Sequence, residues 1–313
     1  MTTQREEEFT HVLRLIPYDY CGEQSTFALA IEPINIPSDD RSRRRKQQRR
    51  STKPKKSSLS SAFFVDLCPP ENSRAGRRAT GASGTSDLLI QAVAPRKGSI
   101  SSSDNGHRDG AVVYDLTAGL GQDSLFLAMN GAKHVHMVER NPIVGALLQD
   151  AMRRLQLISS SSFNVLSECD KSYQQHQKQK ELATSLLKKL SLTIGDGKDI
   201  IQKQQQQQCD VIYLDPMFPT RQKQSAVKKG MTILHGLLET QNKVIAIDKK
   251  KEQEEQDLLS SALDAARLRV VVKRPIKAPL LGGDEIAKPS YVITGSVNRW
   301  DVYVKPQLSS SSS

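Results

Sequence analysis

The sequence has few cysteines, few aromatic residues and no long apolar run. Its four cysteines are widely separated and form no C-x-x-C pair, which argues against a zinc site and favours reduced thiols in an intracellular compartment. No apolar stretch is long enough to cross a membrane. The first eight residues are acid-rich, so we expect neither a secretory signal nor a transit peptide. These absences favour a soluble intracellular protein without a metal site, and either the cytoplasm or an organelle (plastid or mitochondrion) fits them.

The formal net charge of +11 comes from one segment. Residues 41–56 contain ten Lys or Arg residues and no acid, and the rest of the chain has 35 basic residues against 34 acidic ones. Such a run attracts nucleic acid through phosphate contacts. A nuclear-import-like signal and a solvated loop are the alternatives.

Polar inserts divide the chain into two expected parts. Residues 1–98 are expected to form a small N-terminal β-containing subdomain with a basic, low-complexity loop at 41–60. A main domain is expected at 111–305, followed by a disordered tail at 306–313. In the main domain, five βα units are followed by two closing strands, which predicts an α/β fold with a doubly wound sheet. Strands are expected at Thr26–Pro33 and Ala62–Leu67, and polar inserts at Ser159–Glu181 and Lys243–Gln256.

The main domain opens with a strand, a glycine loop and a helix. The strand Val112–Asp115 leads into a G-x-G at Gly119 and Gly121. In such a unit, backbone N–H groups approach a ligand closely. Ser124 stands where a third glycine would complete the dinucleotide fingerprint, so a tight turn without a ligand is the alternative.

Acidic residues end the next two strands. Glu139 follows the strand that begins at His134, where an acid accepts hydrogen bonds from ribose hydroxyls in nucleotide-binding sheets. Asp196 stands before Gly197 at the end of the following strand. An acid there can bind the amino group of an adenine, and an ordinary Asp-Gly turn is the alternative.

The fourth strand, Val211–Leu214, ends on Asp215, Pro216, Met217 and Phe218. Ligands of open α/β sheets bind beyond the carboxyl ends of the strands. A planar base with an amino group could stack on Phe218 and donate to Asp215 and to the Pro216 carbonyl. The alternative is a solvated acid followed by a core phenylalanine.

Taken together, these four strand ends favour one class of enzyme. A dehydrogenase would explain the glycine loop and Glu139, but it would not explain an acceptor beside an aromatic ring on the fourth strand. An S-adenosylmethionine (SAM) methyltransferase acting on an amino group explains all four. Asp115, Gly119 and Gly121 would lie against the cofactor. Asp215, Pro216 and Phe218 would bind the substrate amine.

Five motifs resemble the bacterial RsmJ family of small-subunit (16S) ribosomal RNA guanine-N2 methyltransferases. They are Asp115–Asp123, Val138–Pro142, Tyr213–Pro219, Lys228–Lys229 and Val270–Pro275. Phe64–Asp66 and Arg77-Arg78 are similar to the N-terminal part of that family. The resemblance covers most of residues 24–304 and implies a Rossmann-like, seven-stranded class I methyltransferase sheet with SAM as cofactor. It implies cofactor contacts at Gln122, Asp123, Glu139, Arg140, Asp196, Gly197 and Asp215.

The resemblance also implies an RNA partner, either small-subunit ribosomal RNA or the ribosomal subunit. We expect no membrane or metal partner and a monomer or weak dimer. Residues Ser73–Gly84 hold three arginines and are expected to be flexible backbone beside an anion. Methylation of another amine, such as adenine N6 or a protein glutamine, and a non-catalytic ribosome-assembly factor on the same fold are the alternatives. The candidates for phosphate contacts are Arg77, Arg78, Arg221, Lys223, Lys228, Lys229, Lys273 and Arg274.

Overall fold

The fold is seen in a computed structural model. It describes residues 11–20, 24–33, 62–80, 87–94, 110–161, 171–203, 209–216, 247–283 and 286–306. The basic loop expected at 41–60 and the tail from residue 307 lie outside these ranges. So do Met217, Phe218 and four of the expected phosphate contacts, Arg221, Lys223, Lys228 and Lys229.

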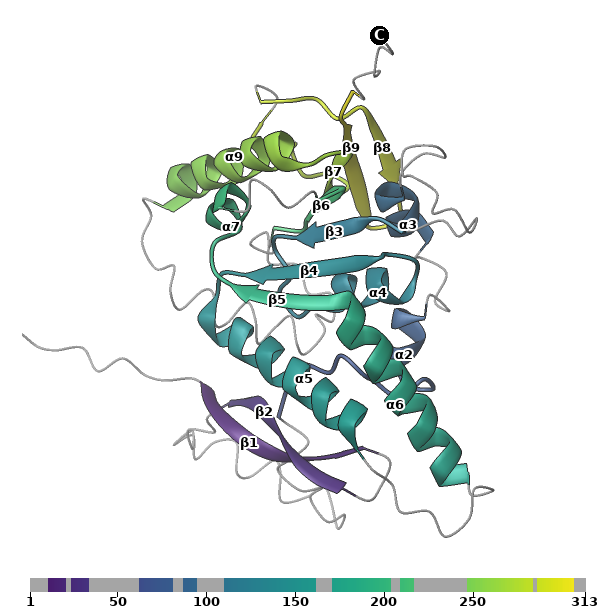
Figure 1. The fold of residues 1–313 in the computed structure, drawn as a ribbon. Coiled ribbons are helices and arrows are strands. Elements are labelled where there is room, and N and C mark those ends of the chain that lie inside the picture. Colours follow the sequence, from purple (N-terminus) through teal and green to yellow (C-terminus); the bar gives the residue numbers. More distant parts are fainter. Residues whose placement is uncertain are drawn as a thin grey trace, which may run out of the picture.

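A seven-stranded sheet organises the main domain, in the order β5-β4-β3-β6-β7-β9-β8 (Figure 1). Neighbouring strands are parallel from β5 to β7, whereas β9 is antiparallel to both β7 and β8. The strand order reverses between β3 and β6, the point where such sheets leave a crevice for a ligand. The expected Rossmann-like fold is confirmed. The strands are β3 (Val112–Asp115), β4 (His134–Glu139), β5 (Leu190–Ile194), β6 (Val211–Leu214), β7 (Arg269–Pro275), β8 (Tyr291–Thr294) and β9 (Asn298–Val304).

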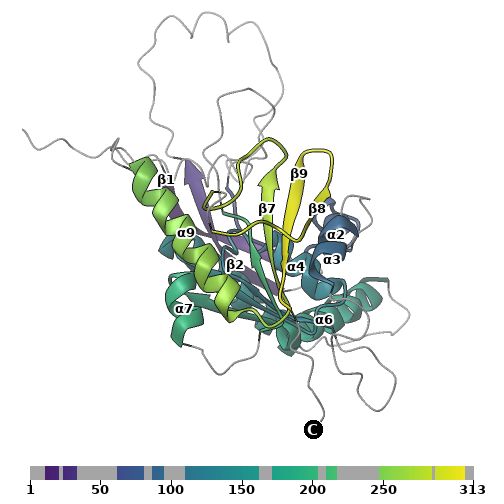
Figure 2. The same ribbon diagram turned by 90° about the horizontal axis from the view of Figure 1, so that it is seen from above.

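Helices cover both faces of this sheet, so its central strands are apolar on both sides. All four residues of β6 are buried, and Val270 to Val272 of β7 have no exposed area. Figure 2 shows α7 and α9 on one side of the sheet and α2, α3, α4 and α6 on the other. The helices are α2 (Arg74–Ala79), α3 (Asp87–Val93), α4 (Gln122–Met129), α5 (Pro142–Ser160), α6 (Lys171–Lys189), α7 (Gly197–Lys203) and α9 (Ile247–Ala265).

Three helices include residues that the sequence analysis treats as polar inserts or flexible backbone, and those expectations are wrong there. Helices α6 and α9 begin within the expected inserts, because Gln, Lys and Glu favour a helix and each helix buries a narrow apolar face. Helix α2 replaces flexible backbone. The hydroxyl of Ser73 caps it by accepting from the Gly76 N–H at 2.9 Å. A Cβ at Gly76 would collide with the Pro70 carbonyl, so this glycine serves close packing.

An antiparallel hairpin of β1 (His11–Tyr20) and β2 (Gln24–Pro33) lies beside α5. Strand β1 is absent from the sequence-based expectation. The strand expected at Ala62–Leu67 is reduced to one bridge, in which Phe63 and Ile31 exchange two backbone hydrogen bonds of 2.7 and 2.9 Å.

Arg154 of α5 joins the hairpin to the main domain. Its side chain is 2% exposed and donates to Asp150 at 2.9 Å and to the Val65 carbonyl. The guanidinium carbon lies 4.6 Å from the centre of the Tyr18 ring and 5.4 Å from that of Phe64. A buried cation is tolerated when it is paired and hydrogen-bonded in this way.

We expect Arg154→Ala to lower the free energy of unfolding by about 3 kcal/mol, because it leaves Asp150 with less compensation and empties the space between the two rings. Urea unfolding measures the change. The matched control is Arg153→Ala, since Arg153 also pairs with Asp150 but is 45% exposed. It should cost less than about 1 kcal/mol. Equal losses in the two variants would contradict the role given to Arg154.

Candidate active site

Four acidic side chains gather at the carboxyl edge of the sheet. Asp115 and Glu139 are the last residues of β3 and β4, and Asp215 follows β6 directly. Asp123 lies in the first turn of α4, where the helix dipole favours a negative charge. The expected site residues of the first, second and fourth strands are therefore brought to one edge.

The glycine loop takes a backbone conformation that requires glycine. Gly119 and Gly121 have φ angles of 54° and 68°, in the left-handed region that other residues adopt at a cost. A Cβ on Gly121 would also lie 2.9 Å from the Leu148 side chain and 3.3 Å from that of Leu67. The loop is thus packed tightly against α5 and against the segment that precedes α2.

Glu139 holds this loop against β4. One carboxylate oxygen accepts from the Gly119 N–H at 2.8 Å, and the other accepts from the Asn141 N–H at 2.7 Å. Burial raises the pKa of Glu139, and these two N–H groups offset part of the rise. Each carboxylate oxygen has a second lone pair, so the residue keeps acceptor capacity for a ligand.

Asp115 stabilises the glycine loop through hydrogen bonds to residues on either side of it. It is 2% exposed and accepts from the Thr117 N–H at 3.2 Å and from the Ser124 hydroxyl. Burial raises its pKa to about 7, and the hydrogen bond from Ser124 opposes that rise. Ser124, which stands in the place of the third glycine, therefore has a structural partner that the fingerprint does not anticipate.

A chain of polar contacts links Asp123 to Asp215. The Lys273 ammonium lies 2.6 Å from Asp123 Oδ2 and 2.8 Å from Asp215 Oδ2. Asp123 also accepts from the Tyr213 hydroxyl at 2.8 Å and from Arg78 at 3.1 Å. Although burial opposes ionisation, Lys273 lowers the pKa of Asp123 to about 2. Burial alone would lower the pKa of Lys273, but the two carboxylates raise it.

Of the two carboxylates that bind Lys273, Asp215 is the more accessible, with 39% of its side chain exposed against 15% for Asp123. Its backbone N–H donates to the Thr117 hydroxyl at 2.6 Å, which ties the end of β6 to the loop after β3. Loss of water raises the pKa of Asp215, and Lys273 opposes the rise. Pro216 follows it within the described residues, whereas Phe218 does not, so the stacking role of Phe218 stays a prediction.

The acid that follows β5 is closer to the surface than those that end β3 and β4. Asp196 is exposed, and it accepts from the Lys198 N–H at 2.9 Å at the start of α7. Gly197 is buried, and a Cβ there would lie 3.0 Å from Leu116 Cβ. Gly195 donates to the Glu139 carbonyl at 2.9 Å, so the ends of β4 and β5 are joined.

The structure describes four of the eight expected phosphate contacts, Arg77, Arg78, Lys273 and Arg274, as well as Arg140, which is an expected cofactor contact. Arg77 is exposed, and Arg78 donates to Gln122 at 2.8 Å as well as to Asp123. Arg140 is 64% exposed and pairs with Glu254 at 3.2 Å, above the end of β4. Arg274 is 2% exposed and donates to the Pro279 carbonyl at 2.9 Å, so its side chain is withdrawn from the surface, and its phosphate role stays a prediction. Lys273 is engaged by the carboxylates of Asp123 and Asp215, and its phosphate role also stays a prediction.

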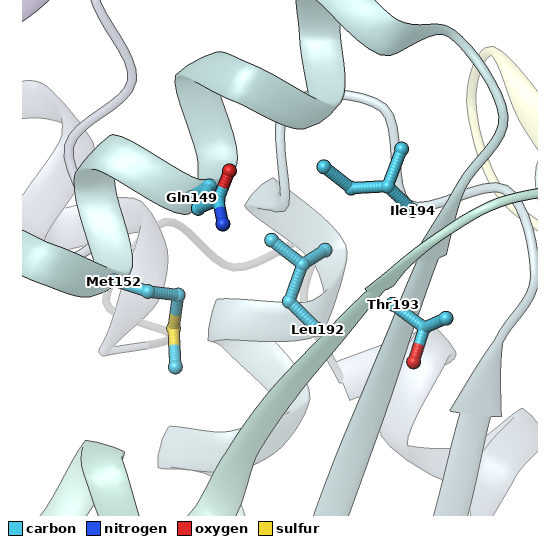
Figure 3. A pocket seen from close by; sticks show the side chains of 5 residues that line it. All are labelled: Gln149, Met152, Leu192, Thr193 and Ile194. Atoms are coloured by element: carbon cyan, nitrogen blue, oxygen red, sulfur yellow. The ribbon is translucent and has the colours of Figure 1, made fainter.

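A separate hollow lies between α5 and the edge strand β5 (Figure 3). None of its lining side chains is ionisable, so it supplies no acid or base. Within the described ranges, no group of three or more His, Cys, Asp or Glu residues is placed to hold a metal ion, and no helix is long and apolar enough to span a membrane. The hollow is lined by Gln149, Met152, Leu192, Thr193 and Ile194.

Because Asp115 has a raised pKa in the folded protein, its contribution to stability is largest below about pH 4 and is lost as the pH rises towards about 7. We therefore expect the unfolding free energy of the wild type to fall relative to that of Asp115→Asn across this window. The difference grows by at most about 1.4 kcal/mol per pH unit. Urea unfolding from pH 4 to pH 8 measures both proteins, and parallel stability curves would contradict the buried, proton-binding state of Asp115.

Comparison with known proteins agrees with this geometry. A family model described as "Putative SAM-dependent methyltransferase" matches residues 43–165 and 164–305. Proteins named ribosomal RNA small subunit methyltransferase J match from Cellvibrio japonicus, at 36% identity over 63% of this chain and 62% of theirs, and from Marinobacter nauticus, at 33% identity over 74% and 67%. The chain thus spans about three fifths of the length of the first of these relatives.

A solved structure of a SAM-dependent methyltransferase from Neisseria gonorrhoeae shares the fold, with a TM-score of 0.53 and 23% identity over 97% of this chain and 86% of that one. The family model covers most of the chain, and the match to the Marinobacter protein extends over two thirds of that relative. The family expected from the motifs is thereby confirmed, and the chain belongs to the RsmJ family of SAM-dependent methyltransferases.

Proposed function

We propose that the protein transfers a methyl group from SAM to the exocyclic N2 amine of a guanosine in small-subunit ribosomal RNA. The observation that carries this proposal is the place of Asp215. It is a part-exposed carboxylate at the tip of β6, at the reversal of strand order and linked to the glycine loop through Thr117. The curated relatives are named as small-subunit ribosomal RNA methyltransferases, which supports this substrate class.

The residues at the carboxyl edge suit SAM. Its sulfonium and ammonium groups are positive and its ribose has two hydroxyls, while the edge offers buried carboxylates with unused acceptor capacity. A Cβ at Gly119 would meet only the Thr117 carbonyl oxygen, at 3.8 Å, so the loop leaves space for a ligand at that position. Bound SAM supplies an electrophilic methyl group. The residues that would hold it are Asp115, Gly119, Gly121, Gln122, Asp123, Glu139, Arg140, Asp196, Gly197 and Asp215.

The chemistry left to the protein is placement of a poor nucleophile. The lone pair of the guanine amine is delocalised into the ring, and an acceptor on each N–H favours a more tetrahedral nitrogen. Asp215 and the Pro216 carbonyl are the proposed acceptors, so catalysis is mainly positioning and electrostatics. The N–C bond would form as the S–C bond to the methyl group breaks, which leaves a neutral thioether, and Asp215 would take up the proton that the methylated amine releases. Phe218 would stack on the base, which contributes about 1–3 kcal/mol.

The RNA would approach from the side of α2. Arg77 and Arg78 stand there, one exposed and one beside the glycine loop. If the target guanosine lies in a helix, it must be splayed out to reach Asp215. The segment after Pro216 carries four further cations and follows the site directly in the chain.

The direct test is methylation of small-subunit ribosomal RNA, and of the subunit itself, followed by nucleoside analysis. We expect N2-methylguanosine in the wild-type reaction. Asp215→Ala should lower kcat by at least about 10²-fold, because it removes the acceptor for the amine. Asp199→Ala removes an exposed carboxylate on α7 and should leave the rate unchanged. N6-methyladenosine as the product, or an active Asp215→Ala enzyme, would refute the assignment.

The RNA path has its own test. Arg77→Ala should weaken RNA binding and reduce the slope of log affinity against log salt by about one, because one phosphate contact is lost. Fluorescence anisotropy between 50 and 200 mM salt measures this slope. Lys188→Ala is the control, since Lys188 is exposed just before β5, at the opposite end of the parallel strands. The same slope in all three proteins would exclude Arg77 from the path.

A further inference from the structure

The register of the sheet brings Lys273 to Asp215. Val272 of β7 pairs with Leu214 of β6, so the next residues of the two strands, Lys273 and Asp215, are also neighbours. Val272 and Leu214 both pack in the core on the α9 side. Because side chains alternate along a strand, Lys273 and Asp215 both point to the other side, towards Asp123 at the start of α4.

The groups around the Lys273 ammonium are mostly acidic. Asp123 and Asp215 accept from it at 2.6 and 2.8 Å. Burial raises the pKa of the neighbouring Asp115 of β3, and the charges of Asp123 and Asp215 add to that rise. The Tyr213 hydroxyl donates to Asp123. Besides Lys273, Arg78 is a second cation that acts on Asp215, and it is bound to Asp123. Without Lys273, ionised Asp215 would face like charges, and its protonation would be favoured.

Lys273 also fixes which oxygen of Asp215 is available. The ammonium binds Oδ2, while no donor within the described part of the chain reaches Oδ1. The backbone N–H of Asp215 is fixed separately by Thr117. Lys273 and Thr117 thus fix the orientation of the Asp215 carboxylate, and Oδ1 is left to accept from an incoming N–H group.

We propose that Lys273 is a positioning residue that holds Asp215 ionised and oriented for the substrate amine, with Asp123 as its second anchor. This inference rests on the proposed methyl transfer and assigns a role in it to a residue that would otherwise be counted as a phosphate contact. The side chain of Lys273 is 15% exposed, and a phosphate could reach the ammonium only by competing with both carboxylates.

Lys273→Met tests the proposal through kinetics. We expect kcat at pH 7 to fall on the order of 10²-fold, with the KM for RNA changed by less than about threefold. Removing the cation raises the pKa of Asp215, so the acid limb of the kcat profile should move to higher pH and activity should partly recover there. Lys273→Arg keeps the charge and should keep the wild-type pH profile, at a reduced kcat. Lys188→Met, a charge loss remote from the cluster, should match the wild type.

A second measurement does not need activity. Carboxyl-carbon NMR titration of Asp215 in the wild type and in Lys273→Met should show a higher pKa in the variant, and the same spectra report whether it is folded. An unchanged pKa of Asp215 would overturn the proposal. So would a raised KM with a flatter salt slope and normal kcat, which is the signature of a phosphate contact. If Lys273→Met does not fold, Lys273→Arg decides, since a shifted acid limb in that variant would also overturn it. Absence of methylation by the wild type would refute the proposed function, while the titration would still decide the inference.

Discussion

Several carboxylates at one edge of a parallel sheet repel one another, and much of the site is arranged to offset that cost. Asp115 is withdrawn from water and binds a proton readily, with a pKa of about 7. Glu139 is neutralised in part by two backbone N–H groups. The remaining pair, Asp123 and Asp215, share the ammonium of Lys273. The negative charge is offset in a different way at each strand end, because burial, the direction of the backbone N–H groups and the strand register differ there.

Much of this arrangement could be predicted from the sequence. Short apolar runs that end on an acid identify parallel strands, and parallel strands place their ends at one edge. The glycine loop, Glu139 and Asp215 therefore follow from local pattern. The partners of these residues do not, since Ser124 bonds Asp115 across a loop and Lys273 meets Asp215 only through the pairing of β6 with β7. Arg274 is adjacent to Lys273 in sequence and carries the same charge, but its side chain is buried and donates to the Pro279 carbonyl.

The missed elements have a common physical cause. Polar composition predicts exposure, but a helix such as α6 or α9 needs only a narrow apolar face to be held on the domain. Strand β1 was missed because part of its burial comes from a partner far along the chain: Arg154 lies over the buried ring of Tyr18, and no local window of sequence reveals that contact. The central aromatic of the fourth strand end, Phe218, lies outside the described residues, and its role stays a prediction.

Leu67 touches the position that a side chain on Gly121 would occupy, and Val65, two residues earlier, accepts from Arg154. The segment ahead of α2 is therefore a wall of the glycine loop as well as a link to the hairpin. A shortened protein that began at β3 would keep the four acidic residues at the sheet edge but lack the surface against which the glycine loop packs. The N-terminal subdomain expected from composition therefore supplies part of the packing that holds the glycine loop in place.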